Sequence, residues 1–593
     1  MANIMSMKSV RNKPTRSGYD LSQKINFTAK AGALFPVWWQ PVLPFDDLRV
    51  IVKSFVRTQP LNTAAFARMR GYFDFYFVPY RQLWNKFPTA ITQMRTNLLH
   101  ASGPVLDDND PLSDELPYFT AFQVADYINS LGDSKNQFGF YRAWLVCILL
   151  EYLGYGDFYA YIPQAAGGQG LSFEENPMLA NLKFSPFPLM VYQKIYADFH
   201  RYTQWERSNP STFNMDYVSG SADSLQMDFS LPGFKDSFNL FDIRYCNWSR
   251  DLLHGTIPQA QYGEASAVPL SDQSFVITDG KLQFNPTNQG DLNLATDGNN
   301  YLGTGTVGSV NSTTFNLTGT PSEYGSISVL ALRRAEAAQK WKEVSLAAEE
   351  DYPSQIQAHW GQSVNKAFSD MCEWLGSINI DLSINEVVNS NITGDNAADI
   401  AGKGTMSGNG SVDFNVGGQY GIVMCIFHVL PQLDYITSAP HFGTTLTNVL
   451  DFPIPEFDKI GMEQVPVIRG MNPVKSDSGF PVSENLYFGY APQYYNWKTT
   501  LDRSMGEFRR SLKTWIIPFD DAQLVAADSV DFPNNPNVEP DSVKAGFFKV
   551  SPSVLDNLFA VKADSDLNTD QFLCSTFFDA KVVRSLDPNG LPY

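Results

Sequence analysis

Residues 378–385 read Ile-Asn-Ile-Asp-Leu-Ser-Ile-Asn, and this stretch decides the fold class. Aliphatic and polar side chains alternate in it without a break, which places every aliphatic side chain on one face of an extended chain. The same period of two recurs near the N-terminus in residues 48–53 and 72–77. Further strand-like stretches follow at residues 412–416, 421–429, 545–550 and 571–583. The sequence therefore predicts strands in both terminal parts of the chain.

The middle of the chain has a helical period instead. In residues 188–205, Val191, Ile195 and Phe199 recur four positions apart, and Pro188 suits the first turn of a helix. Similar patterns predict further helices over residues 120–131, 140–153, 327–350 and 354–375.

Residues 264–325 are polar and consist mainly of Gly, Asn, Thr, Ser, Asp and Gln. They form either a β-rich surface insertion or a long flexible loop. A connection of this length is usually functional, so the segment is predicted to be more than a linker.

The order of these elements favours one large domain. At about 150 residues per domain, 593 residues would suit roughly four units. Each β-rich end, however, has too few strands to close a sheet by itself. We therefore predict a mainly β fold, a single β-sandwich whose inter-strand loops have grown into partly helical insertions. No repeat of fixed period is found, which disfavours propellers and solenoids.

Charge and composition point to a protein that is covered by partners. Aromatic residues make up 14% of the chain and charged residues only 18%, and aromatic side chains are favoured where proteins meet. The formal charge is −19, yet the first 100 residues carry +10, so the rest of the chain carries −29. The basic N-terminal tail is predicted to be extended or disordered and suited to neutralising phosphate.

Motifs for catalysis are missing from the sequence. Residues 303–308, Gly-Thr-Gly-Thr-Val-Gly, match a dinucleotide-binding pattern but follow no apolar strand and open no helix. The six histidines lack the close spacing of zinc hydrolases, and His428 is expected to be a hydrogen-bonded core residue. We expect no enzyme activity and identify no cofactor. The five cysteines are expected to be buried and reduced: Cys147, Cys246, Cys372, Cys425 and Cys574.

No stretch is long and apolar enough to insert into a membrane, since a span needs about 18 such residues. No signal peptide is visible either, so we expect the protein to stay in a reducing cytoplasm.

Four short blocks within the N-terminal part carry a family resemblance. They are Gly-Ala-Leu-Phe-Pro-Val at 32–37, Val-Leu-Pro-Phe-Asp-Asp at 42–47, Arg-Thr-Gln-Pro-Leu at 57–61 and Phe-Tyr-Phe-Val-Pro-Tyr-Arg-Gln-Leu-Trp at 75–84. In this order they resemble the opening of the major capsid proteins of microviruses, the small single-stranded DNA phages. Later blocks at 186–196, 247–263 and 332–341 resemble further segments of that family. Leu252-Leu253-His254 departs from its usual Tyr-Phe-Thr.

The resemblance implies a specific architecture and assembly. It implies an eight-stranded viral jelly roll with large, partly helical loop insertions. Copies of the chain would form a T=1 icosahedral shell around a circular single-stranded DNA genome, assembled in the cytoplasm of the host bacterium. Further partners would be minor virion proteins (a DNA pilot protein and a small basic DNA-binding protein) and a receptor on the host surface. Carbohydrate-binding or carbohydrate-active β-sandwich proteins and phage adhesins are the alternatives.

The resemblance also divides the chain and assigns candidate sites. The predicted parts are a genome-facing basic arm (1–30), the first jelly-roll strands (31–110), a helical insertion (111–263), a surface protrusion (264–325), a second helical insertion (326–376) and the remaining strands with C-terminal loops (377–593). Candidate DNA-contacting residues are Lys8, Arg11, Lys13, Arg16, Lys24 and Lys30. Candidate residues of the protrusion, placed near the threefold axes, are Gly303, Gly305, Gly308 and Asn311. Trp38 and Trp39 either stack on bases or pack within the shell.

Overall fold

The fold was analysed in a computed structural model. It describes residues 14–92, 116–171, 182–218, 226–229, 234, 238–266, 281–282, 292–296, 301–303, 329–364, 369–388, 400–437, 439–471, 486–528, 543–561 and 569–588. The chain divides into two compact units, one made of Met1–Ala260 with Ala348–Tyr593 and the other of Gln261–Ala347.

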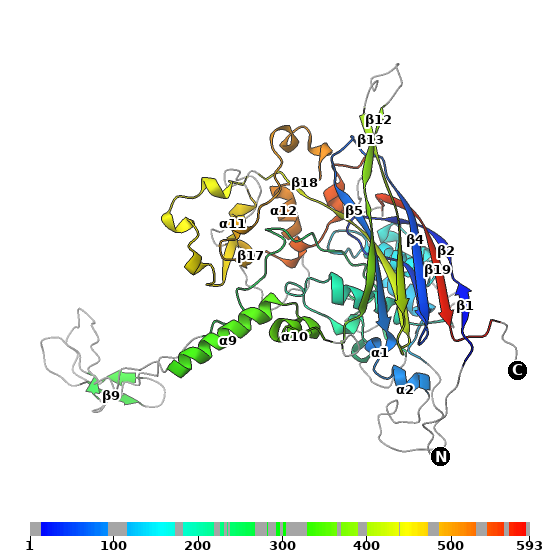
Figure 1. Cartoon of the computed structure of the whole chain (residues 1–593), viewed down its shortest axis with the longest axis horizontal. Coiled ribbons are helices and arrows are strands. Elements are labelled where there is room, and N and C mark those ends of the chain that lie inside the picture. Colours follow the sequence, from blue (N-terminus) through cyan, green and yellow to red (C-terminus); the bar gives the residue numbers. More distant parts are fainter. Residues whose placement is uncertain are drawn as a thin grey trace, which may run out of the picture. The chain divides into compact units, whose positions relative to one another are not determined.

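The first unit is built on a six-stranded antiparallel sheet. Its strands are β1 (Ser17–Asp20), β2 (Gln23–Ala29), β4 (Asp47–Thr58), β12 (Ser383–Val388), β13 (Ile400–Asn415) and β19 (Phe572–Arg584). The order is β1-β19-β4-β13-β12, and β2 pairs with β19 beyond the end of β1. Strands from the two ends of the chain therefore lie side by side, as Figure 1 shows for the blue and red arrows.

A second sheet has four antiparallel strands in the order β11-β5-β14-β3. These are β3 (Phe35–Val42), β5 (Met69–Pro79), β11 (Glu373–Asp381) and β14 (Gly421–Pro431). Strand β3 was not predicted, because Pro36 and Pro41 interrupt its pattern. Proline cannot donate to a ladder, and β3 tolerates both residues because it lies at the edge of the sheet.

The two sheets pack face to face and form the predicted β-sandwich. Trp38 of β3 stacks on Phe578 of β19 with ring centroids 5.7 Å apart. Phe27 of β2 meets Phe427 of β14 at 5.2 Å. The chain crosses directly from β11 in one sheet to β12 in the other at Leu382, whose N–H donates to the carbonyl of Met69. The structure is thus strand-rich with antiparallel sheets, consistent with the predicted β-sandwich.

Glycines of β13 allow the two sheets to approach closely. The positions of β13 that face the other sheet include Gly404, Gly408 and Gly410. A Cβ atom at Gly410 would come within 2.8 Å of Ile378 Cγ1, and one at Gly408 would overlap with the side chain of Ile380. Both isoleucines belong to β11, so these small residues make room for a row of large ones.

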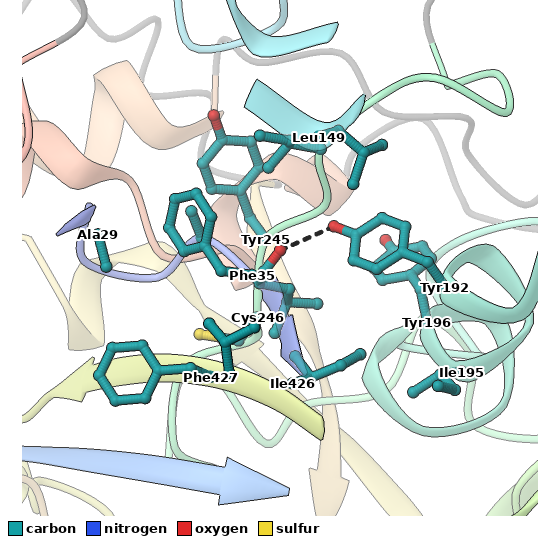
Figure 2. Packing of buried hydrophobic residues seen from close by; sticks show 14 of the residues in the cluster. Ala29, Phe35, Leu149, Tyr192, Ile195, Tyr196, Tyr245, Cys246, Ile426 and Phe427 are labelled. Atoms are coloured by element: carbon teal, nitrogen blue, oxygen red, sulfur yellow. Dashed lines mark hydrogen bonds between the residues drawn. The ribbon is translucent and has the colours of Figure 1, made fainter. Parts of the chain in front are cut away.

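Helices of the middle region cover the outer face of the four-stranded sheet. They are α3 (Ala121–Ser130), α4 (Arg142–Tyr152) and α6 (Phe187–Ile195), which continues as a π-helical turn over Tyr196–His200. Strand β14 is consequently buried on both faces. In Figure 2 Phe35 of β3, Ile426 of β14 and Tyr192 of α6 lie in one cluster, and the Tyr192 hydroxyl donates to the carbonyl of Leu34 at 3.0 Å.

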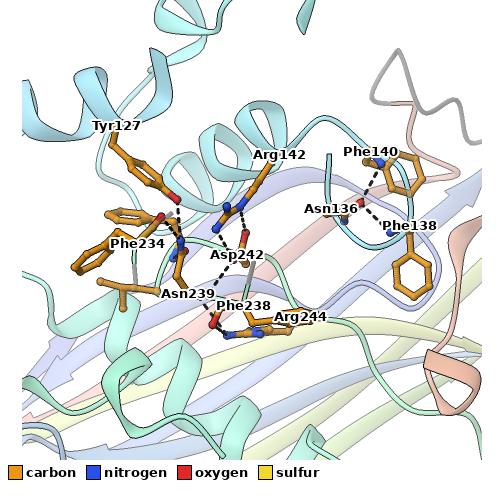
Figure 3. A network of polar contacts seen from close by, with 12 residues as sticks. Tyr127, Asn136, Phe138, Phe140, Arg142, Phe234, Phe238, Asn239, Asp242 and Arg244 are labelled. Atoms are coloured by element: carbon orange, nitrogen blue, oxygen red, sulfur yellow. Dashed lines mark hydrogen bonds and ion pairs between the residues drawn. The ribbon is translucent and has the colours of Figure 1, made fainter. Parts of the chain in front are cut away.

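A buried polar network fixes this helical layer. The Arg142 guanidinium forms two hydrogen bonds with the Asp242 carboxylate, at 2.7 and 2.9 Å. Asn239 donates to the Tyr127 hydroxyl at 2.9 Å and to the carbonyl of Phe234 at 2.7 Å. Figure 3 shows that these contacts join α3 and α4 to the loop that carries Asp242 and Arg244. The charges are buried but paired, as a stable interior requires.

Shorter elements complete the unit. They are α1 (Tyr80–Leu83), α2 (Phe87–Thr92), β6 (Phe119–Thr120), β7 (Lys183–Phe184), α7 (Met215–Val218), α10 (Tyr352–Trp360), β15 (Asp434–Tyr435), β16 (Met462–Pro466), β17 (Tyr487–Pro492), α11 (Tyr495–Lys498), β18 (Pro518–Phe519) and α12 (Asp521–Asp528). No described helix is both long and apolar enough to cross a bilayer.

Two predictions from local pattern were wrong. The helix predicted over 354–375 ends at Gly361, whose φ of 70° terminates α10, and the chain is already in β11 from Glu373. Residues 545–550 contain a buried 3₁₀ turn over Ala545–Phe548 instead of a strand. Within the predicted basic arm (1–30), strands β1 and β2 pair with β19.

The second unit contains a small antiparallel sheet in the order β10-β9-β8, made of Lys281–Leu282, Leu292–Thr296 and Tyr301–Gly303. It also contains helix α9, Val329–Ala347. Its described part is therefore β-containing, and its limits at 261 and 347 differ from the boundaries predicted at 264 and 325.

Candidate nucleic-acid interface

The outer face of the six-stranded sheet carries rows of basic and aromatic side chains. Only the inner face of this sheet is buried, so residues of β4 and β19 alternate between buried and exposed. In one row Lys24 of β2 lies opposite Phe577 of β19, and Phe577 lies opposite Lys53 of β4. The Cβ atoms of directly opposed residues in such a sheet are about 5 Å apart, so the exposed Phe577 side chain lies in one row with those of Lys24 and Lys53.

Neighbouring rows on the same face continue this pattern. Phe55 lies two residues from Lys53 along β4, and Arg57 follows two residues later. The Arg57 guanidinium is 5.1 Å from the centroid of the exposed Phe55 ring. On β13 the exposed Lys403 has the same orientation, two residues from Thr405, which lies opposite Arg57. We call Lys24, Lys53, Phe55, Arg57, Lys403 and Phe577 the basic face.

The cations of the basic face form no salt bridges within the part of the chain that the structure describes. Lys24, Lys53, Arg57 and Lys403 form no salt bridge with any residue that the structure describes. At the other end of the same sheet the cations are paired: Arg16 with Asp47 at 2.9 Å, Arg49 with Asp413 at 3.4 Å and Lys581 with Asp579 at 3.6 Å. Unpaired positive charge is thus concentrated at one end of the sheet, in a chain whose formal charge is −19.

This arrangement suits a single-stranded polyanion. Such a strand is bound where cations follow its phosphates and exposed rings stack with its unpaired bases. Phe55 and Phe577 offer ring faces, and the surrounding ammonium and guanidinium groups offer charge. The described residues contain no group of three or more His, Cys, Asp or Glu side chains that could hold a metal ion.

The residues predicted to contact DNA lie in different environments. Lys24 lies on the basic face. Arg16 is near the same sheet, but its guanidinium donates to the Phe45 carbonyl at 2.7 Å as well as to Asp47. Lys30 is only 2% exposed, and its ammonium lies 4.2 Å from the centre of the Phe140 ring. We therefore withdraw Lys30 from the DNA-facing set. Lys8, Arg11 and Lys13 lie outside the described residues.

The predicted tryptophans pack within the subunit. Trp38 is buried against Phe578, and the Trp39 indole N–H donates to the Leu153 carbonyl at 3.1 Å. Of the protrusion residues, Gly303 ends strand β10, while Gly305, Gly308 and Asn311 lie outside the described residues.

Sequence reasoning missed Lys53, Phe55, Arg57, Lys403 and Phe577 as a group. The alternation of residues 48–53 already predicted that Lys53 faces solvent. It carried no information on which strand lies beside β4, and that neighbour is β19, more than 500 residues later in the chain. The signal that would have found the group is a pairing register, which a single sequence does not contain.

Other predicted features are located in the core. All five cysteines are free and buried, as expected. His428 is buried on β14, where its ring stacks on Tyr72 at a centroid distance of 5.0 Å. It is a core residue as expected, but its Nδ1 has no hydrogen-bond partner among the described atoms. Burial lowers its pKa to about 4.

The fold alone defines a class of architecture. It is an antiparallel β-sandwich with helical insertions, and viral capsid proteins are one of the groups that use such double-sheet folds. The chain matches the family described as capsid protein (F protein) over residues 7–101 and 172–590. Since this is most of its length, the chain belongs to that family of phage capsid proteins. Among curated proteins no sequence matches it.

Family membership determines the general role. The chain is a phage major capsid protein, a structural component of the virion that associates with other copies into a shell. This agrees with the resemblance to microvirus capsid proteins, and it favours a structural over a catalytic role.

Proposed function

We propose that this capsid protein forms a T=1 icosahedral shell around a circular single-stranded DNA genome and that its basic face binds this genome. The observation that carries the proposal is the set of unpaired cations interleaved with exposed rings on the six-stranded sheet. Because the same sheet includes β1 and β2, the basic residues Lys8, Arg11 and Lys13 precede a segment that is anchored beside this face.

We also propose that the sandwich is an eight-stranded viral jelly roll. If β1 with β2 and β11 with β12 each count as one interrupted strand, the described sandwich has eight strands. Their orders are β2-β19-β4-β13 in one sheet and β3-β14-β5-β11 in the other. Successive strands along the chain mostly alternate between the two sheets, as the double Greek key of a jelly roll requires.

The remaining partners follow from the same proposal. Inside the host bacterium the shell would assemble with the genome, a DNA pilot protein and a small basic DNA-binding protein. The unit that contains Gly303, Gly305, Gly308 and Asn311 would form a protrusion near the threefold axes and contact a host receptor. A receptor contact suits a long polar insertion, because such insertions commonly carry binding functions.

Imaging of assembled particles tests the shell. Expression of the chain, alone and with the other virion proteins, should yield closed particles whose electron-microscopy reconstruction has icosahedral symmetry with 60 copies, the number that T=1 defines. Open tubes or a strictly monomeric product under all conditions would contradict the proposal.

A charge-removal series tests the basic face. The triple variant Lys24→Gln, Lys53→Gln, Arg57→Gln should weaken binding of the dissociated subunit to single-stranded DNA. The slope of log affinity against log salt concentration should fall by about 2, since each lost phosphate contact removes about 0.7. The measurement is fluorescence anisotropy with a labelled oligonucleotide at several salt concentrations.

A matched control uses the paired end of the same sheet. The variant Arg16→Gln, Arg49→Gln, Lys581→Gln removes the same charge from residues that already contact Asp47, Asp413 and Asp579. It should change the salt slope much less. Equal effects of the two triple variants would show that only net charge matters and would remove the basic face from the proposal.

A further inference from the structure

Residues 442–460 expose an unusual amount of apolar surface. The side chains of Val449 and Leu450 are 80% and 69% exposed, more than any other aliphatic residue nearby. Further exposed apolar residues in this segment are Phe452, Phe457 and Ile460. Single exposed apolar residues are ordinary, but a group of this kind marks an interaction site. We call residues 442–460 the apolar loop.

Hydrogen bonds hold the tip of the apolar loop in one shape. Val449–Asp451 form a 3₁₀ turn whose N-cap, Asn448, accepts from the Leu450 N–H at 3.2 Å. The Asp451 carboxylate accepts from the backbone N–H groups of Asn448 and Thr447, both at 2.8 Å. These hydrogen bonds lower the pKa of Asp451. The tip therefore presents Val449 and Leu450 outward from a fixed turn.

The rest of the apolar loop is attached to helix α11 and to Tyr494, the residue that precedes this helix. The ring of Phe452 lies 6.1 Å from that of Trp497, and the Ile454 N–H donates to the Tyr494 hydroxyl at 3.3 Å. Asp458 pairs with Lys498 at 2.6 Å. Figure 1 shows this yellow segment beside α11 and β17. A loop held at both its tip and its base loses little further entropy when a partner covers it.

The charge and the apolar content of the apolar loop indicate which kind of partner it binds. Its ionisable residues are Asp451, Glu456, Asp458 and Lys459, an excess of acid that does not suit a nucleic acid. An apolar centre with a polar rim is the composition of a protein–protein contact. Since this chain belongs to a capsid family and associates with its own copies, the partner present at every subunit is a second copy. We propose that the apolar loop of each subunit docks on a neighbouring copy in the shell.

This inference rests on the proposed shell assembly but can fail separately from it. Carbene footprinting compares particles of the unaltered protein with subunits dissociated from them. Val449 and Leu450 should be labelled at least tenfold less in particles. If particles form and both residues are labelled equally in the two states, the docking proposal is wrong while shell assembly stands. If no particles form, shell assembly itself fails.

Cross-linking identifies the partner. Because all five native cysteines are buried, Leu450→Cys provides an exposed thiol that can carry a photo-reactive benzophenone. Irradiation of particles should give an adduct of two 66.3 kDa chains. An adduct only with another virion protein, or none, would overturn the proposal.

A substitution test completes the experiment. The double variant Val449→Asp, Leu450→Asp should lower particle yield at least tenfold while the dissociated subunit keeps its unfolding midpoint, since both side chains are exposed. The control Tyr217→Asp changes an exposed ring on α7 and should leave the yield within twofold. Equal losses in both variants would contradict a specific role of the apolar loop. If the double variant fails to fold, footprinting and cross-linking still test whether the apolar loop docks on a neighbouring copy.

Discussion

At the scale of single residues, buried charges are held by specific partners. Lys549 and Glu206 are both almost fully buried and lie 2.7 Å apart. The Tyr196 hydroxyl donates to Glu206 at 2.6 Å and accepts from Lys549 at 2.9 Å. Burial alone would raise the pKa of Glu206, but the Lys549 ammonium and these hydrogen bonds outweigh it, so this pKa is lowered. The pair joins the loop that follows α6 and its π-helical turn to the C-terminal part of the chain.

Removing one member of this pair should be costly. Lys549→Met leaves the Glu206 carboxylate buried without its cation, so we expect a loss of about 3–5 kcal/mol in unfolding free energy. The exposed Lys581→Met is the control and should cost no more than about 0.5 kcal/mol. Urea titration of dissociated subunits measures both. A loss below 1 kcal/mol for Lys549→Met would mean that Glu206 becomes protonated or solvated at little cost.

Two buried histidines should make the subunit sensitive to acid. His200 and His428 lie with ring centroids 5.5 Å apart, near Asp74, Tyr72 and Tyr76. Burial lowers the pKa of His428 to about 4 and that of His200 well below its usual value. The unfolded chain therefore binds these protons more readily, and stability present above pH 6.5 is lost as the pH falls toward 4. Asp74, whose pKa burial raises to about 6, opposes this below pH 6.

The variant His428→Phe keeps the stacked ring but removes the titrating group. It should retain about 2–3 kcal/mol more stability than the unaltered chain when the pH is lowered from 7 to 4.5. Thermal unfolding of the variant and of the unaltered chain at a series of pH values measures this difference, and parallel profiles for the two would refute the assignment.

At the scale of secondary-structure elements, strand β13 contains glycines because its inner face lies very close to the side chains of β11. Its sequence contains glycines at 402, 404, 408 and 410, which weakens the strand pattern that only residues 412–416 had shown. Glycine costs stability within a strand because it loses more conformational freedom on folding. Larger residues do not fit at Gly408 and Gly410, because Ile378 and Ile380 of β11 occupy the space that their side chains would need.

Filling that space should therefore destabilise the sandwich. Gly408→Ala places a Cβ against Ile380, and we expect a loss of about 1–3 kcal/mol from overpacking. Gly417→Ala is the matched control, since no atom lies within 4 Å of its new Cβ. It should be neutral or slightly stabilising. Chemical denaturation of the two variants compares them, and equal stabilities would show that β11 moves aside freely.

Strands and helices could be predicted where the hydrophobic period of the sequence matched the burial of the element in the fold. Strands β4, β5 and β19 and helix α3 have clear periods, and they lie where these periods placed them. Strand β14 and helix α4 are buried apolar runs without a clear period, and they too lie at the residues where they were predicted. The helix predicted to continue to residue 375 stops at Gly361, because this residue adopts a left-handed conformation. The strand predicted at 545–550 is a turn buried on all sides, and an apolar run of that kind fits either structure.

At the scale of the whole molecule, the described residues of the second unit contribute nothing to the hydrophobic core of the first. That core includes none of the residues that the structure describes between Gln261 and Ala347. Replacement of residues 267–328 by a flexible Gly/Ser linker should therefore leave the unfolding midpoint of the remaining chain unchanged within about 2 °C. Calorimetry checks this. Replacement of α4, whose side chains lie in the core, is the contrasting control and should abolish folding. A shortened chain that does not fold would place residues 267–328 in the core.

The sequence by itself determined the fold class, the family and the uneven distribution of charge. Strand periods depend on residues two positions apart, and the family blocks are short and local, so both are readable without a structure. Only the tertiary structure decided that Lys30 is buried, that β1 and β2 belong to the sheet, and that Lys24 faces Phe577. Pairing between the two ends of a 593-residue chain is set by cooperative burial of one sheet face against the other, and no local pattern encodes it.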